Sequence, residues 1–513
     1  MKLKLPSSPK KIMCLAVLTA TCFFSASIAP SSTLAQNLPT LGDTERQDLS
    51  PLMERKLGEQ IMQSVRRDPD YMDDAPLSEY LNRLGNRMLE TRPDARGEAM
   101  YDFEFFAVRD PVLNAFAFPG GFIGFHSGLI LTAQSESELA SVMGHEIGHV
   151  AQRHIARMIG SQKVDSLIPI AAMILAALAA RSSPDAAMAL AVGGQGVAIQ
   201  RQLNFSREAE READRVGFQI LRDAGFDTAG MVSFFGRLQV ATRNYNDTAP
   251  AYLRSHPLTS ERMADIQARM IDQRYKQYVD SFEFSLARAR VRVLQTDTPQ
   301  GYMDAATFFD TQLKTDQEDS KLAARYGFAF LAYKQKDYAK AQELLDKVVK
   351  QVETSPRQKI ALKTTSMFAS LDIDIKLATK QYDTAVKLAE QAMQQLPLSR
   401  GIVYQYVDAL VAANRHEDAA RFLRDQVQLY RQDPKLQNQL GKVYELQGKQ
   451  ALQHIALAEA YALNSALPAA LQQLDIARRA PDAQYYDQAV IDAKEREWKE
   501  KHKDEMKDEK NRK

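Results

Sequence analysis

The sequence predicts a mainly α-helical protein of two or more domains, in which a helical domain with a small antiparallel sheet precedes an all-α solenoid. The chain has 513 residues, which is longer than a domain built on a single hydrophobic core usually is. Apolar residues recur with helical spacing through most of it, apart from one strand-rich stretch. Helical repeats follow in the C-terminal part. We expect a signal peptide at residues 1–35 and a flexible lead-in at residues 36–50. A first folded domain is expected at residues 51–294, a repeat domain at 302–485 and a charged tail at 486–513.

The first 35 residues have the features of a Sec-type signal peptide. Lysines precede an apolar run at residues 12–29, and the small side chains of Thr33 and Ala35 suit cleavage after Ala35. An uncleaved membrane anchor is the alternative, but hydroxyl side chains interrupt the run. The sequence therefore predicts an exported protein whose signal peptide is removed.

Cysteine content and charge limit the chemistry. Cys14 and Cys22 both lie in the signal segment, so the mature chain has no disulfide and no thiol, and any metal is held by histidines and carboxylates. The formal net charge of +1 indicates no nucleic-acid partner. Residues 167–180 are apolar but shorter than the roughly 20 residues of a spanning helix. We expect this segment to be buried, and peripheral contact with a membrane is the alternative.

The strand-rich stretch comprises residues 101–108 and 115–128. These segments flank the turn Pro119-Gly120-Gly121, which predicts a small antiparallel sheet. The strand Asn114–Phe118 is a candidate edge on which an extended substrate docks by backbone pairing. An ordinary sheet edge closed by a turn is the alternative.

Residues 302–485 follow a break at residues 295–301 and carry repeats of the tetratricopeptide type. Such repeats place a small residue early in their second helix and an apolar residue four positions later. This pattern occurs at Ala341/Leu345, Ala385/Ala389, Ala419/Leu423 and Ala470/Leu474. The intervals of 44, 34 and 51 residues indicate an interrupted array, and an arbitrary helical bundle is the alternative. The tail is expected to be a solvated helix or disordered.

The run HEIGH at residues 145–149 is the candidate catalytic centre. Its histidines are four residues apart in a helix predicted from about Glu136 to Met158, so both imidazoles lie on one face and can bind one Zn²⁺. Glu146 is the candidate general base for a water that attacks a peptide carbonyl. Gly148 is expected to leave room beside the metal.

Catalytic zinc needs a third protein ligand and an open fourth position. The continuation HExxHxxGxxH is excluded, because Gln152 and Ile155 occupy the positions of its glycine and histidine. His154 is one residue away from that position and is expected to point away from the histidine pair. The third ligand must therefore be distant in sequence.

A second acidic helix, SREAEREAD at residues 206–214, offers that ligand. Glu210 and Asp214 share one face, so one can bind the metal while the other accepts a hydrogen bond from a ligand imidazole. Glu208 and Glu212 are expected to be solvated on the opposite side. Spacing alone does not firmly separate Glu208 from Glu210.

Four motifs together resemble one known family, the zinc peptidases that include the CAAX-prenyl proteases and the bacterial HtpX protease. These are MGHEIGHV, SREAEREADRVG, NAFAFPGG upstream and RSHP with a following Glu-Arg downstream, in the family's order. The resemblance covers about residues 50–275 and implies a zincin-like fold. It implies one Zn²⁺ per subunit, held by His145, His149 and Glu210. It also implies that Asp214 donates a proton or orients a ligand.

His256 lies in the last of these motifs, before a proline. In this family architecture it could reach the zinc and stabilise an oxyanion, or occupy the open position as a resting-state latch; a surface histidine is the alternative. Arg262 is a weaker candidate for the same neighbourhood, and an ion pair with Glu261 or Asp265 is its alternative.

The signal peptide and the repeats, taken with the resemblance, imply a periplasmic branch of this family. We expect a zinc metalloendopeptidase that acts in outer-membrane protein quality control and β-barrel assembly. Unfolded or misassembled outer-membrane proteins would be its clients, and the repeats would recruit them or the barrel-assembly machinery. A chaperone or scaffold that binds through the repeats, with little proteolysis, is the alternative.

Overall fold

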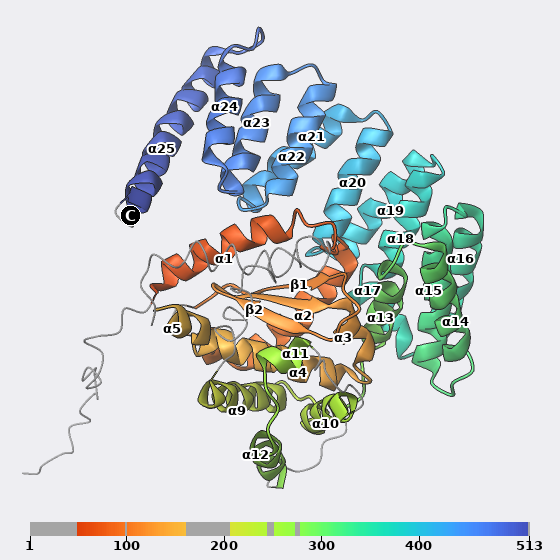
Figure 1. Cartoon of the computed structure of the whole chain (residues 1–513). Helices are drawn as coiled ribbons and strands as arrows, with labels where there is room; N and C mark the ends of the chain where they lie inside the picture. Colours follow the sequence, from red (N-terminus) through yellow and green to blue (C-terminus); the bar gives the residue numbers. More distant parts are fainter. Residues whose placement is uncertain (1–48, 98–99, 161–205, 244–250, 272–277, 511–513) are drawn as a thin grey trace, which may run out of the picture. The chain divides into compact units, whose positions relative to one another are not determined.

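The computed structural model describes residues 49–97, 100–160, 206–243, 251–271 and 278–510 (Figure 1). The predicted signal peptide, nearly all of the lead-in and the apolar segment 167–180 lie outside these ranges. The described chain is mainly helical, as predicted. None of its helices combines the length and the apolar composition that crossing a membrane requires.

A three-stranded sheet forms the centre of the N-terminal part. Its strands β1 (Glu104–Val108), β2 (Ala115–Phe118) and β3 (Phe122–His126) lie in the order β1-β3-β2. The hairpin of β2 and β3 is antiparallel, as predicted, but β1 runs parallel to β3. The prediction of a wholly antiparallel sheet is therefore wrong, and the sheet is mixed. Every residue of β3 is buried, which suits the central position and leaves β2 at an edge.

The turn between β2 and β3 depends on its two glycines. Gly120 and Gly121 have φ angles of +80° and +95°, which side chains with a Cβ rarely adopt. A Cβ on Gly120 would also lie 2.7 Å from the Cα of Arg55. Helix α1 (Pro51–Val65) thus packs directly on this turn.

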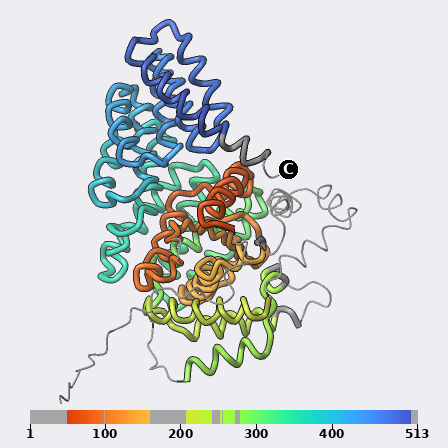
Figure 2. Tube along the Cα trace, turned by 90° about the vertical axis from the view of Figure 1, so that its left-hand side faces the viewer, coloured from red at the N-terminus to blue at the C-terminus, as the bar shows by residue number. Residues whose placement is uncertain are grey.

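The C-terminal part consists of successive antiparallel helices, which Figure 2 shows stacked side by side. They are α14 (Pro299–Gln312), α15 (Glu318–Lys334), α16 (Tyr338–Thr354), η3 (Gln358–Ile360), α17 (Ala361–Thr364), α18 (Met367–Ala378), α19 (Tyr382–Gln395), α20 (Arg400–Ala412), α21 (His416–Leu429), α22 (Pro434–Leu446), α23 (Gln450–Leu463), α24 (Leu467–Arg478) and α25 (Tyr485–Lys510). All eight alanine and leucine positions predicted from the repeat pattern are buried. The predicted repeats are confirmed.

The irregular repeat intervals have a structural cause. The turn inside each helix pair contains one residue with a left-handed backbone, at Lys336, Lys380, Asn414, Gly448 and Ser465. The turns at Lys380, Asn414 and Gly448, in the middle of the array, are 34 residues apart. The first interval is ten residues longer because η3 and α17 are inserted. The last is 17 residues because α23 pairs with both α22 and α24, which adds one helix to the array.

The charged tail is helical through Lys510, so of the two alternatives predicted for it, a helix or a disordered segment, the helix is confirmed. It is not wholly solvated, because Trp498 is 5% exposed and packs with Ile491 and Leu474.

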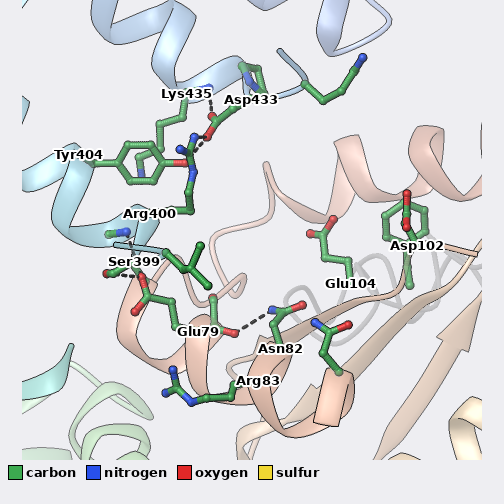
Figure 3. A pocket seen from close by; sticks show the side chains of 18 of the residues that line it. Glu79, Asn82, Arg83, Asp102, Glu104, Ser399, Arg400, Tyr404, Asp433 and Lys435 are labelled. Carbon is green, nitrogen blue, oxygen red and sulfur yellow. Dashed lines mark hydrogen bonds and ion pairs between the residues drawn. The ribbon is translucent and has the colours of Figure 1, made fainter. Parts of the chain in front are cut away.

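A cavity of about 1810 Å³ is lined by α1, α2 (Ala75–Thr91) and helices of the repeats (Figure 3). On one side of it the Glu79 carboxylate of α2 accepts hydrogen bonds from the Ser399 hydroxyl (2.7 Å) and the Gly401 backbone N–H (3.0 Å). Both donors lie at the N-terminus of α20, where a negative charge is favourable. Figure 3 also shows Asp433 beside Arg400 and Tyr404.

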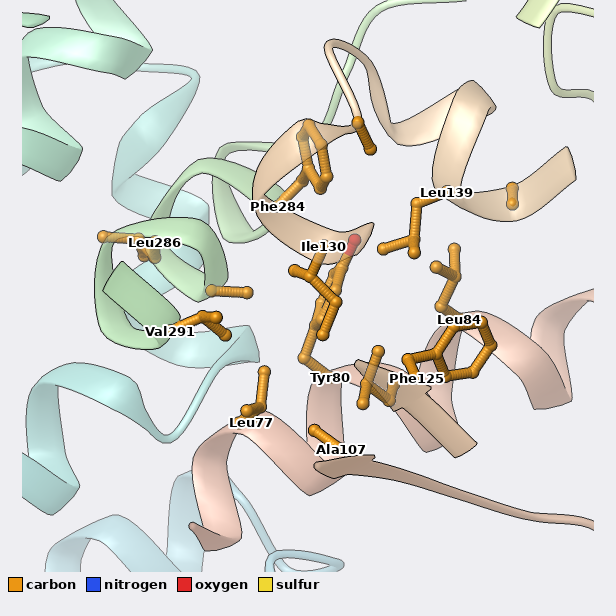
Figure 4. Packing of buried hydrophobic residues seen from close by; sticks show 14 of the residues in the cluster. Leu77, Tyr80, Leu84, Ala107, Phe125, Ile130, Leu139, Phe284, Leu286 and Val291 are labelled. Carbon is orange, nitrogen blue, oxygen red and sulfur yellow. The ribbon is translucent and has the colours of Figure 1, made fainter. Parts of the chain in front are cut away.

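The main hydrophobic core lies between α2, the sheet, α3 (Ser127–Thr132), α4 (Glu136–Ala151) and α13 (Phe282–Leu294). Figure 4 shows side chains from all of these elements meeting, among them Leu77, Tyr80, Leu84, Ala107, Phe125, Ile130, Leu139, Phe284, Leu286 and Val291. The same cluster continues into α15 and α16, across the predicted break at residues 295–301. The first repeat helices therefore share one core with the N-terminal part.

Helices α4 and α9 (Arg207–Asp223) cross in direct backbone contact. A Cβ on Gly217 would lie 2.8 Å from the Gly144 carbonyl carbon, and one on Gly148 would lie 2.8 Å from the Ala213 carbonyl oxygen. The prediction that Gly148 leaves room beside a metal is therefore wrong, since the space that it leaves is filled by α9. This close crossing positions the residues described next.

Candidate metal centre

His145 and His149 lie on one face of α4, as their spacing predicts. Ser135 begins this helix by accepting a hydrogen bond from the Glu138 backbone N–H. The two Nε2 atoms are 3.0 Å apart, and both imidazoles are fully buried. They point towards α9, which carries the predicted third ligand.

Glu210 faces the histidine pair from α9. Ser206 caps this helix, so Glu210 falls in its first turn with the carboxylate directed inward. Its Oε2 lies 3.5 Å from His145 Nε2 and its Oε1 lies 3.4 Å from His149 Nε2. Glu208 is exposed, so the choice between the two glutamates, which spacing left open, falls on Glu210.

His256 follows the short helix α11 (Ala251–Ser255) and joins this cluster. Its Nδ1 lies 2.9 Å from Glu210 Oε1 and 3.4 Å from His145 Nε2. It is 2% exposed, so the alternative of a surface histidine is wrong. The Tyr252 ring packs 4.8 Å from its ring, a contact that no sequence pattern indicated.

The four side chains suit one tetrahedral metal ion. Their ligand atoms all lie within 4.8 Å of one another, with close contacts between 2.9 and 3.5 Å. Metal–ligand distances of 2.0–2.1 Å place tetrahedral ligands about 3.3 Å apart. Three imidazole nitrogens and one carboxylate oxygen are also a donor set that divalent transition metals accept. The residues therefore fit a metal.

Asp214 lies one turn beyond Glu210 and contacts the first histidine from outside the cluster. Its Oδ1 is 3.0 Å from His145 Nδ1, the arrangement predicted for a carboxylate that holds a ligand imidazole. Asp214 also accepts two hydrogen bonds from Arg262, at 2.6 and 2.8 Å.

Arg262, on α12 (Ser260–Ile271), thus belongs to the site. Its Nη1 is 2.7 Å from Glu210 Oε2 and donates to the Pro257 carbonyl at 2.8 Å. The alternative ion pair with Glu261 or Asp265 is wrong: those carboxylates pair with Arg211 and Arg269. One guanidinium therefore links α12, α9 and the segment that carries His256.

His154 does not point away from the histidine pair, and that prediction is wrong. It rested on one continuous helix, in which residues 149 and 154 would face different sides. Instead α4 ends at Ala151, Arg153 has a left-handed φ of 53°, and α5 (His154–Gly160) begins a new direction. His154 Nδ1 is consequently 2.9 Å from His149 Nδ1. A helix break at a residue other than glycine leaves no clear signal in one sequence.

Glu212 was expected to be solvated, but it too contacts this group. Its Oε2 is 3.0 Å from His154 Nε2 and 3.2 Å from an Arg157 nitrogen. Its side chain is 34% exposed, so only part of the carboxylate reaches solvent.

Burial and the close charges shift the pKa values of these groups. Burial alone would raise the pKa of Glu210, but its contacts with His256, His145 and His149 hold it well below its usual range. Burial lowers the pKa of His149 well below 6.5. For His145, burial is outweighed by Asp214 and Glu210, which raise its pKa to about 9. Glu210 is thus ionised and His149 neutral, the forms in which each would bind a metal, and His145 would release a proton on binding one.

Glu146 points into the same space. It is 1% exposed, and neither of its carboxylate oxygens has a hydrogen-bond partner among the described residues. Its Oε1 lies 3.6 Å from His256 Nε2, and burial raises its pKa. A buried carboxylate with free acceptor positions beside four groups that could hold a metal is placed to accept a proton.

A helix-borne HExxH pair joined by a distant glutamate defines a metallopeptidase. Residues 77–270 match the model of peptidase family M48, and residues 376–443 match a tetratricopeptide repeat model. These matches and the site described above support a metalloendopeptidase whose peptidase domain is similar to family M48 and is followed by tetratricopeptide repeats.

Three curated relatives illustrate the similarity. The chain is 36% identical over 325 residues to the putative beta-barrel assembly-enhancing protease of Vibrio cholerae serotype O1, a match that covers 62% of this chain and 65% of the relative, just under two thirds of its length. It is 28% identical over 460 residues to the beta-barrel assembly-enhancing protease of Escherichia coli K12, covering 90% of this chain and 91% of that protein. The mitochondrial metalloendopeptidase OMA1 of Arabidopsis thaliana is 30% identical over 160 residues, 31% of this chain and 30% of that protein.

Proposed function

We propose that this chain is a zinc-dependent endopeptidase of the periplasm that cleaves unfolded or misassembled outer-membrane proteins. The buried cluster of His145, His149, Glu210 and His256, whose ligand atoms all lie within 4.8 Å of one another, carries the proposal. Zinc is the ion that this geometry and donor set favour most, and catalytic zinc sites typically have three protein ligands. His145, His149 and Glu210 are those three, and one ion is expected per subunit.

Bound zinc would supply a Lewis acid that polarises the scissile carbonyl and acidifies water. Glu146 takes a proton from the attacking water and passes it to the leaving amine, because its buried carboxylate has free acceptor positions. The Asp214 carboxylate, with Oδ1 3.0 Å from His145 Nδ1, would hold the proton of that ring on Nδ1 and so keep Nε2 available as the ligand atom. Arg262 compensates the buried charges of Asp214 and Glu210.

His256 acts as a resting-state latch in this proposal. Its Nδ1 lies at the fourth corner of the cluster, where substrate and water must enter, so it has to move before cleavage. Oxyanion stabilisation by the displaced imidazole is the second candidate role. A His256→Ala variant that cleaves casein faster supports the latch, whereas lost cleavage with zinc retained supports the oxyanion role. Unchanged cleavage and unchanged zinc content would contradict both.

Strand β2 is proposed to bind the substrate in extended form. It is an edge strand and packs near α4, so backbone pairing along it would bring a peptide to the centre. Proline at β2 positions whose N–H does not pair with β3 should raise KM while zinc content stays the same. An unchanged KM would contradict this role.

The role in outer-membrane protein assembly rests on the names of the relatives. Two of them are called beta-barrel assembly-enhancing proteases, and one aligns over nine tenths of both chains. The repeats would recruit clients or the barrel-assembly machinery. Export is proposed to end with cleavage after Ala35, which N-terminal sequencing of the periplasmic protein tests.

A Glu146→Gln variant separates proteolysis from scaffolding. It should keep zinc, because no metal ligand changes, but lose cleavage. In a strain that lacks the gene, wild-type protein should then restore outer-membrane assembly while Glu146→Gln does not. Full rescue by Glu146→Gln would instead favour the chaperone or scaffold alternative.

A further inference from the structure

The two histidines of the metal centre are supported differently. His145 has a carboxylate directly at its Nδ1, whereas His149 has another imidazole there, with the two Nδ1 atoms 2.9 Å apart. The Nε2 of that second imidazole, His154, lies 3.0 Å from Glu212 Oε2. A chain of three side chains therefore runs from the centre to a partly exposed carboxylate.

Only one arrangement of protons satisfies this chain. If His149 binds the metal through Nε2, its single proton is on Nδ1 and must be donated outward. His154 Nδ1 then has to accept, so the proton of His154 is on Nε2. That N–H in turn donates to the Glu212 carboxylate, which can only accept. The reverse tautomer of His154 would place two N–H groups 2.9 Å apart.

We propose that His154 and Glu212 are positioning residues that fix the tautomer and ring orientation of His149. This inference rests on the proposed ligand role of His149. Outer hydrogen bonds of this kind fix metal-bound histidines and make them better ligands. Here the neutral imidazole of His154 lies between His149 and the Glu212 carboxylate. The negative charge of Glu212 is therefore one side chain farther from the metal than the charge of Asp214.

The local fold holds His154 in place for this role. The left-handed backbone of Arg153 turns the chain back after α4, and Arg153 is itself fixed by a hydrogen bond to Glu54 of α1 at 2.7 Å. His154 is 4% exposed, and Arg157, one turn along α5, contacts the same Glu212 oxygen at 3.2 Å. A left-handed non-glycine residue is costly unless its surroundings stabilise it.

The zinc affinity of the full mature chain, measured by competition with a chromophoric chelator, tests whether His154 and Glu212 position His149. His154→Phe keeps a planar ring at this position but cannot accept a hydrogen bond from His149, so the affinity should fall about 10–100-fold. His154→Asn carries an acceptor oxygen near the place of Nδ1, so its affinity should stay within about threefold of wild type. Packing alone predicts the opposite order, because phenylalanine retains the ring contacts of His154 and asparagine loses them.

A second pair of variants covers the case in which His154→Phe does not fold. Glu212→Gln should weaken zinc binding by about 3–10-fold, since it removes the charge that orients His154. Glu208→Gln, on the exposed face of the same helix, is the matched control and should have wild-type affinity. The absorption spectrum of the cobalt-substituted protein should change in His154→Phe and Glu212→Gln but not in Glu208→Gln.

The outcomes separate this inference from the proposed function. Wild-type protein without zinc would contradict the ligand set itself. If wild type binds zinc and His154→Phe binds it equally well, the positioning role of His154 is overturned and the ligand set stays intact. The same holds if His154→Phe and His154→Asn lose zinc affinity equally. Equal affinity of Glu212→Gln and Glu208→Gln would overturn the part assigned to Glu212.

Discussion

The crossing of α4 and α9 sets the distance between the histidine pair and Glu210, and Gly217→Ala tests this directly. A Cβ at Gly217 would lie 2.8 Å from both the Gly144 carbonyl carbon and the His145 nitrogen. Ordinary contact begins at 3.4 Å, so the helices must separate by about 0.6 Å. The clashing atoms are backbone, and no side-chain rotation can relieve the overlap.

Two opposing terms determine the change in the free energy of unfolding. Overpacking costs about 1–3 kcal/mol, and replacing a helical glycine by alanine returns up to about 1 kcal/mol. Gly217→Ala should therefore be destabilising by about 1–2 kcal/mol. Gly236→Ala in α10 (Ala229–Arg243) is the matched control. Among the described residues, its Cβ would meet no atom within 4 Å beyond its own turn of helix, so it should gain up to about 1 kcal/mol.

Metal affinity should respond more strongly than stability. Metal sites tolerate ligand displacements of about 0.2 Å, and Glu210 lies two turns from Gly217 on the same helix. A shift of about 0.6 Å should lower zinc affinity by about tenfold or more. The assays are urea denaturation of metal-free protein and chelator competition. If Gly217→Ala matched Gly236→Ala in stability and bound zinc like wild type, the helix crossing would not control the site.

Three further predictions concern other parts of the molecule. Glu79→Gln removes the negative charge from the side chain that accepts hydrogen bonds from Ser399 and Gly401 at the N-terminus of α20. Urea denaturation should show that the free energy of unfolding falls by about 1 kcal/mol. Burial raises the pKa of Asp280 to about 6, so its carboxyl opposes folding as pH rises from about 4 to 6. Asp280→Asn should therefore raise stability by of order 1 kcal/mol at pH 7.5, after allowance for solvent screening, and have little effect at pH 4; no gain at pH 7.5 would contradict this. Chelation of the metal should lower the unfolding temperature of wild type but not of His149→Ala, since ligands stabilise only a state that binds them.

The sequence predicted the parts of the site that follow from helix periodicity. His145 and His149 share a face because they are four residues apart, and Glu210 and Asp214 do so for the same reason. The burial of the repeat alanines followed from the same periodicity. These residues could be assigned because each inference used only positions within one regular helix.

The remaining features depend on where regular structure ends. His154 joins the site because α4 stops at Ala151 and Arg153 turns the chain, and no glycine or proline marks that turn. Arg262 reaches Asp214 through the packing of α12 on α9, although residues of opposite charge lie closer to it in sequence. The parallel pairing of β1 likewise depends on which edge of β3 was occupied, which a hydrophobic pattern does not specify.

Anomalous diffraction at the zinc absorption edge, from crystals of the mature protein, tests the central claim most directly. A single peak is expected about 2.0–2.1 Å from His145 Nε2, His149 Nε2 and a Glu210 oxygen, with His256 Nδ1 as fourth ligand at rest. No peak at this position, or an ion that Glu210 does not contact, would contradict the account.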